Sequence, residues 1–298
     1  MTSTSCNGNR HAYLIMAHNQ WEVLDQLLLA LDDPRNDIYI HFDSKSCPPS
    51  RKHFCDLVSA SHIYFTKRFN IVWGGTQMME CTIHMLEEAM NGHYSHYHFI
   101  SGVDFPLKSQ NYIHRYFEMQ PNRQFVGFDW PGINSGRFLS RVQYYHFLIN
   151  VIGKRDNKSP VHRLMAKIED LSLTIQNKLH INRIDYDMYK GSSWFSITHT
   201  AACAIVAEKD TILKRFSFGA NTDEIWLQTF LKNSQFSDCI VESNMRYIKW
   251  VQGNPSPEIL TMADYDDLCS TDMLFARKFD WNKDHKIILK LKEHISED

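Results

Sequence analysis

Hydrophobic runs and polar breaks alternate along the first part of the chain. Residues 11–17 and 38–42 are apolar runs of strand length, and polar residues follow each of them. Between the two runs, leucines recur at helical spacing over residues 24–31, before two aspartates and a proline stop the helix. This strand–helix–strand order is typical of nucleotide-binding α/β sheets, whose ligands lie beyond the carboxyl ends of the strands. The pattern predicts such a site at His18 and Asp43, although Asp43 could equally be an ordinary loop aspartate.

The same periodicities predict further elements of both kinds. We expect helices at 77–90, 164–179 and 200–207, and strands at 96–100, 124–129 and 245–250. Neither an internal repeat nor a low-complexity tract divides the chain. We therefore expect an α/β protein with a single large domain over residues 1–298.

Residues 191–233 contain the strongest candidate for catalytic chemistry. A short strand follows Gly191, and Asn221 then opens a helix whose first turn contains Asp223 and Glu224. Free backbone N–H groups at a helix start favour an ionised carboxylate, which is the state that a general base requires. The structural alternative is a capping box, because Asn221 and Glu224 have its spacing.

Two other motifs place polar groups beside apolar ones. The loop 101–107 has Asp104 at a strand end, shortly before a proline that fixes the turn. Near the end of the chain, Arg277 and Lys278 lie between apolar residues, an arrangement that can direct cationic groups at a phosphate. Three nearby histidines suggest a metal site, which we disfavour because no carboxylate or cysteine accompanies them; they are His93, His96 and His98.

Residues 133–183 differ in character from the segments around them. Basic and aromatic residues gather near the start of this segment, among them Arg141 and Tyr144. Residues 151–183 contain seven Lys or Arg and three Asp or Glu, a local excess of four positive charges. The usual explanation is a solvated helix face. The alternative is contact with an anionic membrane surface or an acceptor.

Composition narrows the class of protein and its partners. The formal net charge of −2 gives no global attraction to nucleic acid. Seven scattered cysteines without a Cys-x-x-Cys pair argue against a disulfide framework or a structural zinc site, and favour a reducing compartment. The first ten residues are polar, and no apolar run approaches transmembrane length. We expect a cytoplasmic protein, with peripheral contact with the inner face of the membrane as an open possibility.

Seven segments, taken together and in order, resemble the core-2/I-branching β-1,6-N-acetylglucosaminyltransferase family, which also contains the protein O-xylosyltransferases. Each segment is weak evidence alone, but their order over residues 11–280 is specific. The segments are Ile38-Tyr39-Ile40-His41-Phe42-Asp43 with Lys45, Trp73-Gly74-Gly75, Ser101-Gly102-Val103-Asp104-Phe105-Pro106-Leu107, Gly191-Ser192-Ser193-Trp194-Phe195, Thr222-Asp223-Glu224, Arg246-Tyr247-Ile248 with Trp250, and Phe275-Ala276-Arg277-Lys278-Phe279-Asp280.

The resemblance implies a GT-A-like, Rossmann-type mixed sheet flanked by helices, and a metal-independent inverting transfer from a UDP-sugar. It puts the catalytic base on Glu224 and a cation for the leaving diphosphate on Lys278. Other residues expected along the donor are His18, Asp43, Trp73, Gly74, Arg246 and Arg277. Those expected near the sugar or the acceptor are Asp104, Phe105, Ser193, Trp194, Asp223, Arg141 and Tyr144, with residues 133–183 as a helical insertion on the acceptor side.

On this basis GlcNAc is the first candidate for the transferred sugar and xylose the second, with a glycan or lipid-linked glycan as acceptor and a role in cell-surface or capsular polysaccharide synthesis. The UDP-sugar is a co-substrate, and no metal is expected. Two departures stand out. Glu258 replaces a basic residue that relatives often carry after the Ser-Pro turn, and Ser193 replaces an acidic residue that xylosyltransferases tend to have. The lack of a membrane anchor suggests a microbial relative.

Three competing hypotheses remain, the third of which is an interaction protein built on a basic helix and leaves the polar residues at the early strand ends unexplained. A non-catalytic module on the same fold would bind a nucleotide-sugar or a carbohydrate without transferring it. A metal-dependent transferase would use Asp185-Tyr186-Asp187, which has the Asp-x-Asp form that many glycosyltransferases use for a metal–nucleotide sugar. This motif precedes a glycine turn instead of following a strand, so the sequence disfavours the second hypothesis.

Overall fold

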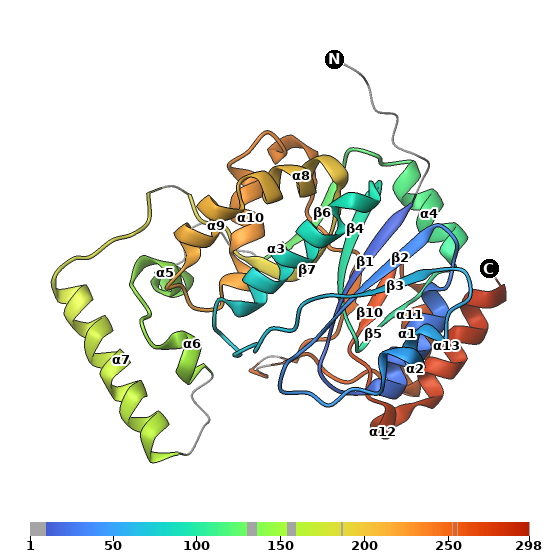
Figure 1. Cartoon of the computed structure of the whole chain (residues 1–298), viewed down its shortest axis with the longest axis horizontal. Helices are drawn as coiled ribbons and strands as arrows, with labels where there is room; N and C mark the ends of the chain where they lie inside the picture. Colours follow the sequence, from blue (N-terminus) through green and yellow to red (C-terminus); the bar gives the residue numbers. More distant parts are fainter. Residues whose placement is uncertain are drawn as a thin grey trace.

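The main sheet of the protein is mixed and runs through the centre of the molecule (Figure 1). A computed structural model describes residues 10–129, 136–153, 159–185, 187–251, 253–254 and 256–297. Within these ranges the sheet has seven strands in the order β3-β2-β1-β4-β7-β6-β8. They are β1 (His11–Ala17), β2 (Asn36–Phe42), β3 (His62–Phe65), β4 (His96–Ser101), β6 (Gln124–Phe128), β7 (Gly191–Thr198) and β8 (Ile240–Val241).

A smaller sheet and a set of helices complete the fold. In the described ranges the second sheet has the order β5-β10-β9, formed by β5 (Asp104–Pro106), β10 (Phe275–Arg277) and β9 (Arg246–Ile248). The α-helices are α1 (Trp21–Leu31), α2 (Arg51–Cys55), α3 (Gln77–Ala89), α4 (Gln110–Glu118), α5 (Gly136–Gln143), α6 (Ile149–Ile152), α7 (Pro160–Lys178), α8 (His199–Ala207), α9 (Lys209–Phe216), α10 (Trp226–Lys232), α11 (Tyr265–Ser270), α12 (Trp281–Asp284) and α13 (Lys286–Glu297). Single 3₁₀ turns are η1 (Met90–Gly92), η2 (Thr222–Glu224), η3 (Ser237–Cys239) and η4 (Met262–Asp264).

The strands of the main sheet run in both directions, and its central strand β1 is buried. β1 lies between β2 and β4 and is parallel to both. Its residues are buried apart from the half-buried Met16, which is why it is apolar at consecutive positions and does not alternate. β7 runs antiparallel to both β4 and β6, so the sheet is mixed. The predicted α/β fold with a mixed sheet flanked by helices is thus confirmed.

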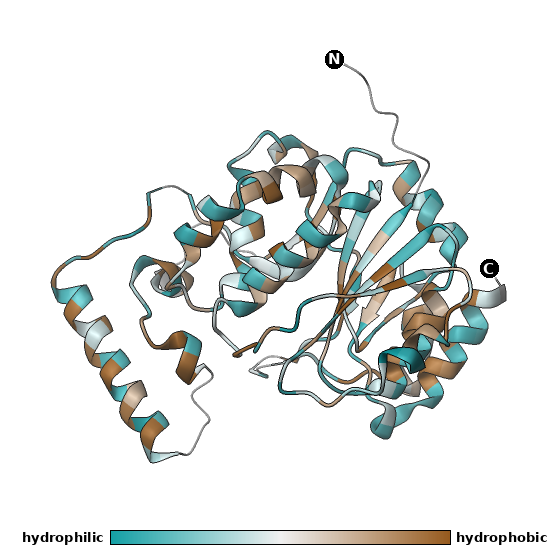
Figure 2. Cartoon of the chain, in the orientation of Figure 1, coloured by the Kyte–Doolittle hydropathy of each residue, from teal (hydrophilic) through white to brown (hydrophobic). Residues whose placement is uncertain are grey.

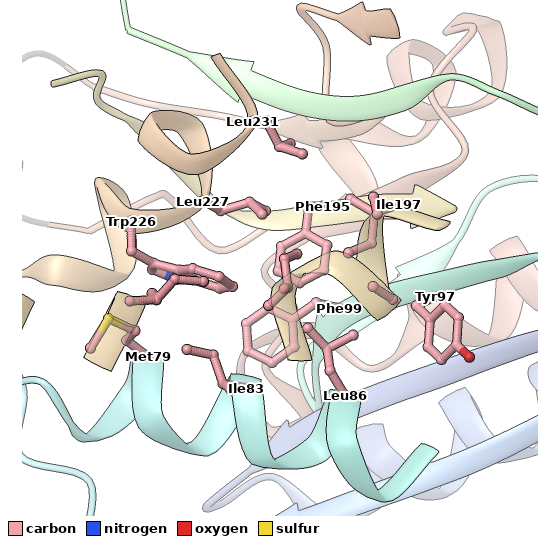
Figure 3. Close-up of a cluster of buried hydrophobic side chains, with 14 of the residues drawn as sticks. Met79, Ile83, Leu86, Tyr97, Phe99, Phe195, Ile197, Trp226, Leu227 and Leu231 are labelled. Atoms are coloured by element: carbon pink, nitrogen blue, oxygen red, sulfur yellow. The ribbon is translucent and has the colours of Figure 1, made fainter. Parts of the chain in front are cut away.

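Helices cover both faces of the main sheet. On one face, α3, α8 and α10 pack over β4 and β7, and Figure 3 shows Met79, Ile83 and Leu86 of α3 close to Phe99 and Trp226. On the other face, α1 and α4 bury their apolar sides against β1 and β2. A third cluster seals the smaller sheet beneath α11 and α13. Burial of this apolar area is the main stabilising term of the fold.

One predicted helix differs from the structure. The sequence predicts a helix that opens at Asn221, whereas residues 222–224 form the 3₁₀ turn η2 and α10 begins only at Trp226. Ile225, with φ −127°, separates the two. The break arises because Asn221 is in the left-handed region (φ 46°) and its N–H donates to Gly74 O at 2.8 Å, a contact from another part of the chain.

Candidate active site

Most of the predicted site residues gather at the carboxyl edge of the main sheet. His18 follows β1 and Asp43 follows β2, and these strands are parallel. Since β7 is antiparallel to β4, with Phe99 opposite Phe195, the first residues of β7 lie at the same edge. Strands that are far apart in sequence therefore bring their polar ends together, as is usual in open α/β sheets.

Glu224 occupies the end of η2 and is oriented by two cations. Its Oε2 lies 2.8 Å from Arg141 Nη1 and 3.4 Å from Lys190 Nζ, and the side chain remains 37% exposed. Lys190 also forms an ion pair with Asp129 at the end of β6. The carboxylate is thus fixed in direction and still open to solvent, which a base for an incoming hydroxyl group requires.

The neighbouring carboxylate has a different environment. Ser193 Oγ donates to Asp223 Oδ2 at 2.7 Å. Burial, and next the charge of Glu224, raise the pKa of Asp223 to about 6, while the Ser193 hydrogen bond opposes that shift. Two adjacent carboxyl groups are therefore electrostatically distinct, and only the Glu224 carboxylate is paired with Arg141 and Lys190.

The capping box that Asn221 and Glu224 could form is absent from the structure. Asn221 makes no side-chain cap hydrogen bond, and its N–H is bonded to Gly74 O. Gly74 has φ +87°, and a Cβ at this position would lie 3.2 Å from Asn221 Oδ1. The loop with Trp73 and Gly74 is therefore bonded to η2 at Gly74, a position whose positive φ favours glycine.

A second cluster lies on the adjoining part of the same edge. Asp104 is fully buried, and its carboxylate accepts hydrogen bonds from Ser101 N and Ser101 Oγ, both at 3.0 Å. Arg277 Nε lies 3.4 Å from Asp104 Oδ1, and the Arg277 guanidinium lies over the Trp194 ring at 4.1 Å. Burial raises the pKa of Asp104, and the Arg277 charge opposes that shift. The Trp194 ring in turn stacks on Phe99.

Adjacent residues of β7 join the two clusters. Ser193 contacts Asp223, and Trp194 contacts Arg277. One strand thus contacts both Asp223, the neighbour of Glu224, and the Arg277 guanidinium.

Two predicted ligand contacts do not fit the structure. Arg246 is 4% exposed, and its guanidinium donates to Phe195 O at 2.7 Å and to Ser196 Oγ at 2.9 Å. Burial lowers the pKa of Arg246 to about 9. Phe105 is fully buried in the cluster beneath α13. Both residues support the site from below and present no surface to a nucleotide or a sugar in this conformation.

The remaining predicted donor residues lie in loops, where Asp43 is buried and the others are exposed or half-buried. Asp43 Oδ1 accepts from Lys45 N at 2.8 Å and Lys45 Nζ lies 3.4 Å from Oδ2, so Asp43 orders its own loop as well as ending β2. Partial desolvation lowers the pKa of the nearby His18, and the Asp43 charge opposes this shift. Lys278 Nζ donates to Ser256 Oγ at 3.3 Å, and Trp73 is a largely exposed ring.

Arg141 and Tyr144, which the sequence predicts on the acceptor side, have different partners in the structure. Arg141, in α5, pairs with Glu224. Tyr144 OH instead donates to Asn177 Oδ1 of α7 at 2.9 Å. Glu258, at the position of the missing basic residue, donates its N–H to Lys249 O at 2.8 Å.

The two candidate metal motifs lie elsewhere. Asp185 pairs with Arg215 at 3.7 Å and Asp187 O accepts from Asn233, beside a cavity of about 290 Å³ between α8, α9 and α10; Tyr186 lies outside the described residues. His96 and His98 are buried at the amino edge of the sheet. Within the described ranges, no group of three or more His, Cys, Asp or Glu side chains is placed to hold a metal ion.

Two site residues were missed by sequence reasoning. Lys190 and Asp129 form an ion pair and bring a second cation to Glu224. Lys190 directly precedes the Gly191 motif, and this adjacency was the only signal in the sequence. Asp129 is the last residue of a predicted strand, but no motif marked it.

A mixed sheet with polar residues gathered at its carboxyl edge defines an α/β protein of the nucleotide-binding type. The chain belongs to the core-2/I-branching enzyme family, because the sequence model described as "Core-2/I-Branching enzyme" matches residues 11–273. This is a family of glycosyltransferases, as the names of similar proteins indicate.

Three similar proteins carry different activities in their names. A β-glucuronosyltransferase of Arabidopsis thaliana is 22% identical over 96% of this chain and 66% of its own length. A human β-1,3-galactosyl-O-glycosyl-glycoprotein β-1,6-N-acetylglucosaminyltransferase is 22% identical over 95% of this chain and 69% of its own length. A xylosyltransferase of Drosophila melanogaster is 23% identical over 91% of this chain and 31% of its own length.

A solved structure is also similar in outline. Apo mouse xyloside xylosyltransferase 1 aligns with 89% of this chain and 96% of its own, at 6% identity and a TM-score of 0.39. Such a score is too low to support conclusions about the site. No helix among the described residues has the length and apolar character needed to cross a membrane.

Proposed function

We propose that the protein is an inverting glycosyltransferase that moves a sugar from a UDP-sugar to a hydroxyl group of a glycan, with Glu224 as general base. The observation that carries the proposal is that two clusters meet on β7. Ser193 contacts Asp223, the neighbour of Glu224, and Trp194 contacts Arg277. Membership of a glycosyltransferase family supports the reaction class.

Direct displacement at the anomeric carbon makes opposite demands on the two sides of the sugar. On one side a base must accept the proton of the acceptor hydroxyl, and on the other positive charge must meet the departing diphosphate. Glu224, oriented by Arg141 and Lys190, meets the first demand. Lys278, next to Arg277 and half-buried, meets the second.

The transfer needs no metal in this proposal, because side-chain cations neutralise the charge that builds on the β-phosphate. A lysine ammonium acts there as a point charge, where a divalent ion would act as a Lewis acid. The position of Asp185 and Asp187 beside α9 and α10, away from Glu224, supports a role for them outside the reaction.

The sugar is the finer part of the proposal. We keep GlcNAc as the first candidate and xylose as the second, with a glycan or lipid-linked glycan of the cell surface or capsule as acceptor. The names of the similar proteins add glucuronic acid as a third donor sugar to be tested. We propose that Ser193, which donates to Asp223, contributes to the choice among these sugars.

The deciding experiment measures UDP release from a panel of UDP-sugars with a glycan acceptor, for the wild type and for Glu224→Gln. The substitution keeps the size of the side chain and removes its basicity, so turnover should fall by about a hundredfold to ten-thousandfold. Affinity for the UDP-sugar, measured by calorimetry, should remain.

Glu87→Gln is the matched control, because Glu87 of α3 is 41% exposed and ion-paired with Lys209 of α9. It should keep full turnover. Near-normal turnover of Glu224→Gln contradicts the assignment of the base. Binding of a UDP-sugar without any UDP release by the wild type would favour the alternative, a non-catalytic binding module on the same fold.

A further inference from the structure

Helix α7 presents an apolar stripe to solvent. Six aliphatic side chains recur every three or four residues along it and are 47% to 67% exposed. The stripe consists of Val161, Leu164, Ile168, Leu171, Ile175 and Leu179. Figure 1 shows α7 at the margin of the molecule, and Figure 2 shows its hydrophobic positions along the helix. An exposed apolar face of this extent marks an interaction surface.

A different side of α7 attaches it to the rest of the chain. Gln176 is buried and exchanges hydrogen bonds with the backbone of Tyr145, at 2.7 and 2.9 Å. Glu169 is buried and accepts from Leu148 N at 3.1 Å. Since both residues lie off the line of the stripe, the stripe is not turned toward the body of the protein.

Exposed cations border the stripe on one flank. Lys167 lies three residues after Leu164, and Lys178 lies three residues after Ile175; eleven residues, three helical turns, separate the two lysines. Both side chains are exposed. The exposed acidic residue, Asp170, lies about 140° around the helix from the centre of the stripe.

A second copy of the chain is a poor occupant for this face. Antiparallel pairing of two α7 helices would oppose the lysine flank of one copy to the same flank of the other, and like charges repel. Parallel pairing of two α7 helices would place the lysine flank of one copy against the opposite flank of the other. That flank has no exposed acidic side chain to pair with the lysines. An anionic partner answers the charge pattern in either case.

We propose that α7 binds in the interfacial plane of an anionic lipid bilayer, with the aliphatic stripe in the acyl boundary and Lys167 and Lys178 at the headgroups. An apolar face bordered by lysines, on a helix too polar to span a membrane, is the pattern of interfacial helices. Lysine stems cover apolar surface while the ammonium groups reach the phosphates.

The consequence for the substrate rests on the proposed function. α7 is bonded to the segment that follows α5, through Tyr144 and Tyr145, and α5 carries the Arg141 that contacts Glu224. A bilayer bound by α7 would therefore lie on the acceptor side of the molecule, where a lipid-linked glycan would present its hydroxyl groups.

The test is co-sedimentation of the full chain with vesicles of phosphatidylcholine containing 30% phosphatidylglycerol, an experimental composition chosen for about one anionic lipid in three. The wild type should bind these vesicles and not pure phosphatidylcholine. Leu164→Gln with Leu171→Gln should weaken binding by about tenfold or more. Lys167→Gln with Lys178→Gln should weaken it by roughly twenty-fivefold, at about fivefold for each charge near the surface.

The matched control is Met119→Gln with Leu289→Gln, which removes two exposed apolar side chains, one directly after α4 and one on α13, and should leave binding unchanged. Circular dichroism verifies the fold of each variant. Absence of wild-type binding overturns the proposal, as does equal binding to neutral vesicles. If the wild type does not bind vesicles, is a dimer in sedimentation velocity, and becomes a monomer in the Leu164/Leu171 variant, the face is assigned to a second copy. UDP release without vesicles tests the proposed function separately.

Discussion

At the scale of single residues, Glu224 shows how a carboxylate can be oriented by the groups around it. Arg141 and Lys190 direct the carboxylate from two sides, while Asp223, with a pKa of about 6, is bonded to Ser193. The two carboxyl groups are adjacent in sequence, and their partners differ. Their chemical roles therefore depend on long-range contacts that the order of residues in this segment does not specify.

Arg141 and Tyr144 should have separable effects on catalysis. Arg141→Gln removes a charged hydrogen bond from Glu224, a loss of about 1.5–3 kcal/mol, so kcat should fall by roughly ten- to hundredfold while UDP affinity stays constant. Tyr144→Phe is the control from the same segment, because its hydroxyl group is bonded to Asn177 and not to Glu224. Equal kcat values for wild type and Arg141→Gln would show that the ion pair has no part in turnover.

Lys278 should be needed for both binding and turnover if the transfer is metal-independent. Activity should persist in excess EDTA, and Lys278→Ala should lose turnover and UDP affinity together, because the diphosphate loses its counter-charge. Lys283→Ala, an exposed lysine of α12, is the control. Loss of activity in EDTA with recovery in manganese, together with an inactive Asp187→Ala, would establish the metal-dependent alternative.

At the scale of elements, the site depends on a junction between a glycine loop and a 3₁₀ turn. Gly74 and Asn221 are both at positive φ and are joined by a backbone hydrogen bond. This junction interrupts the helix that the sequence predicts from residue 221. Local propensity favoured a continuous helix, and a partner 147 positions away, the difference between 221 and 74, prevented it.

Gly74→Ala should reduce turnover by more than the strain of a positive φ alone would. A side chain at positive φ costs about 1–2 kcal/mol, and here the new Cβ would also press on Asn221 Oδ1 at 3.2 Å. Gly253→Ala separates the two effects, because Gly253 has φ +90° with nothing within 4 Å of a Cβ. Thermal denaturation and UDP release should show lost stability and turnover for Gly74→Ala, and normal turnover for Gly253→Ala. Equal turnover of the two variants would contradict a role for the junction in positioning η2.

At the scale of the whole molecule, a buried histidine cluster lies at the opposite edge of the sheet from the site. His11, His96 and His98 are at most 2% exposed, and His11 stacks on His114 at 3.9 Å. His98 Nε2 lies 3.1 Å from His11 Nδ1. Burial, and then the neighbouring histidines, hold the pKa of His11 and His98 well below their usual value and lower that of His96 to about 4.

This cluster should make the fold sensitive to acid. In the folded state the buried histidines stay neutral, whereas in the unfolded chain they gain protons below a pH of about 6.5. Stability should therefore be constant above that pH and fall as the pH drops from about 6.5 toward 4, by up to about 1.4 kcal/mol per pH unit for each proton. Thermal unfolding from pH 8 to pH 5 measures it.

His96→Asn should flatten this pH dependence, since asparagine does not titrate. His180→Asn is the control, because His180 is exposed and its φ of 54° suits asparagine. A wild-type melting temperature that does not change between pH 7 and pH 5 would contradict the proposed effect of the cluster.

The sequence predicted the layers of the molecule better than its contacts. Periodicity gave the bounds of β1 and, within a few residues, those of β2, α3 and α8, because each buries a face whose spacing is local. It could not show that Phe105 and Arg246 are buried, since their burial depends on how β5, β9 and β10 pair. Nor could it show that the apolar side of α7 faces solvent, because periodicity marks an apolar face without indicating what covers it.

The adjacency of Ser193 and Trp194 in β7 has a geometric consequence for the chemistry. Their Cα atoms are joined by one peptide unit, a spacing of about 3.8 Å that no side-chain substitution alters. β7 thus fixes the interval between the residue that contacts the Asp223 carboxylate and the residue that contacts the Arg277 guanidinium. Point substitutions can weaken either end, whereas only an insertion or deletion in the strand would change the interval. Loops and α7 can therefore vary in sequence without changing the interval between these two positions of β7.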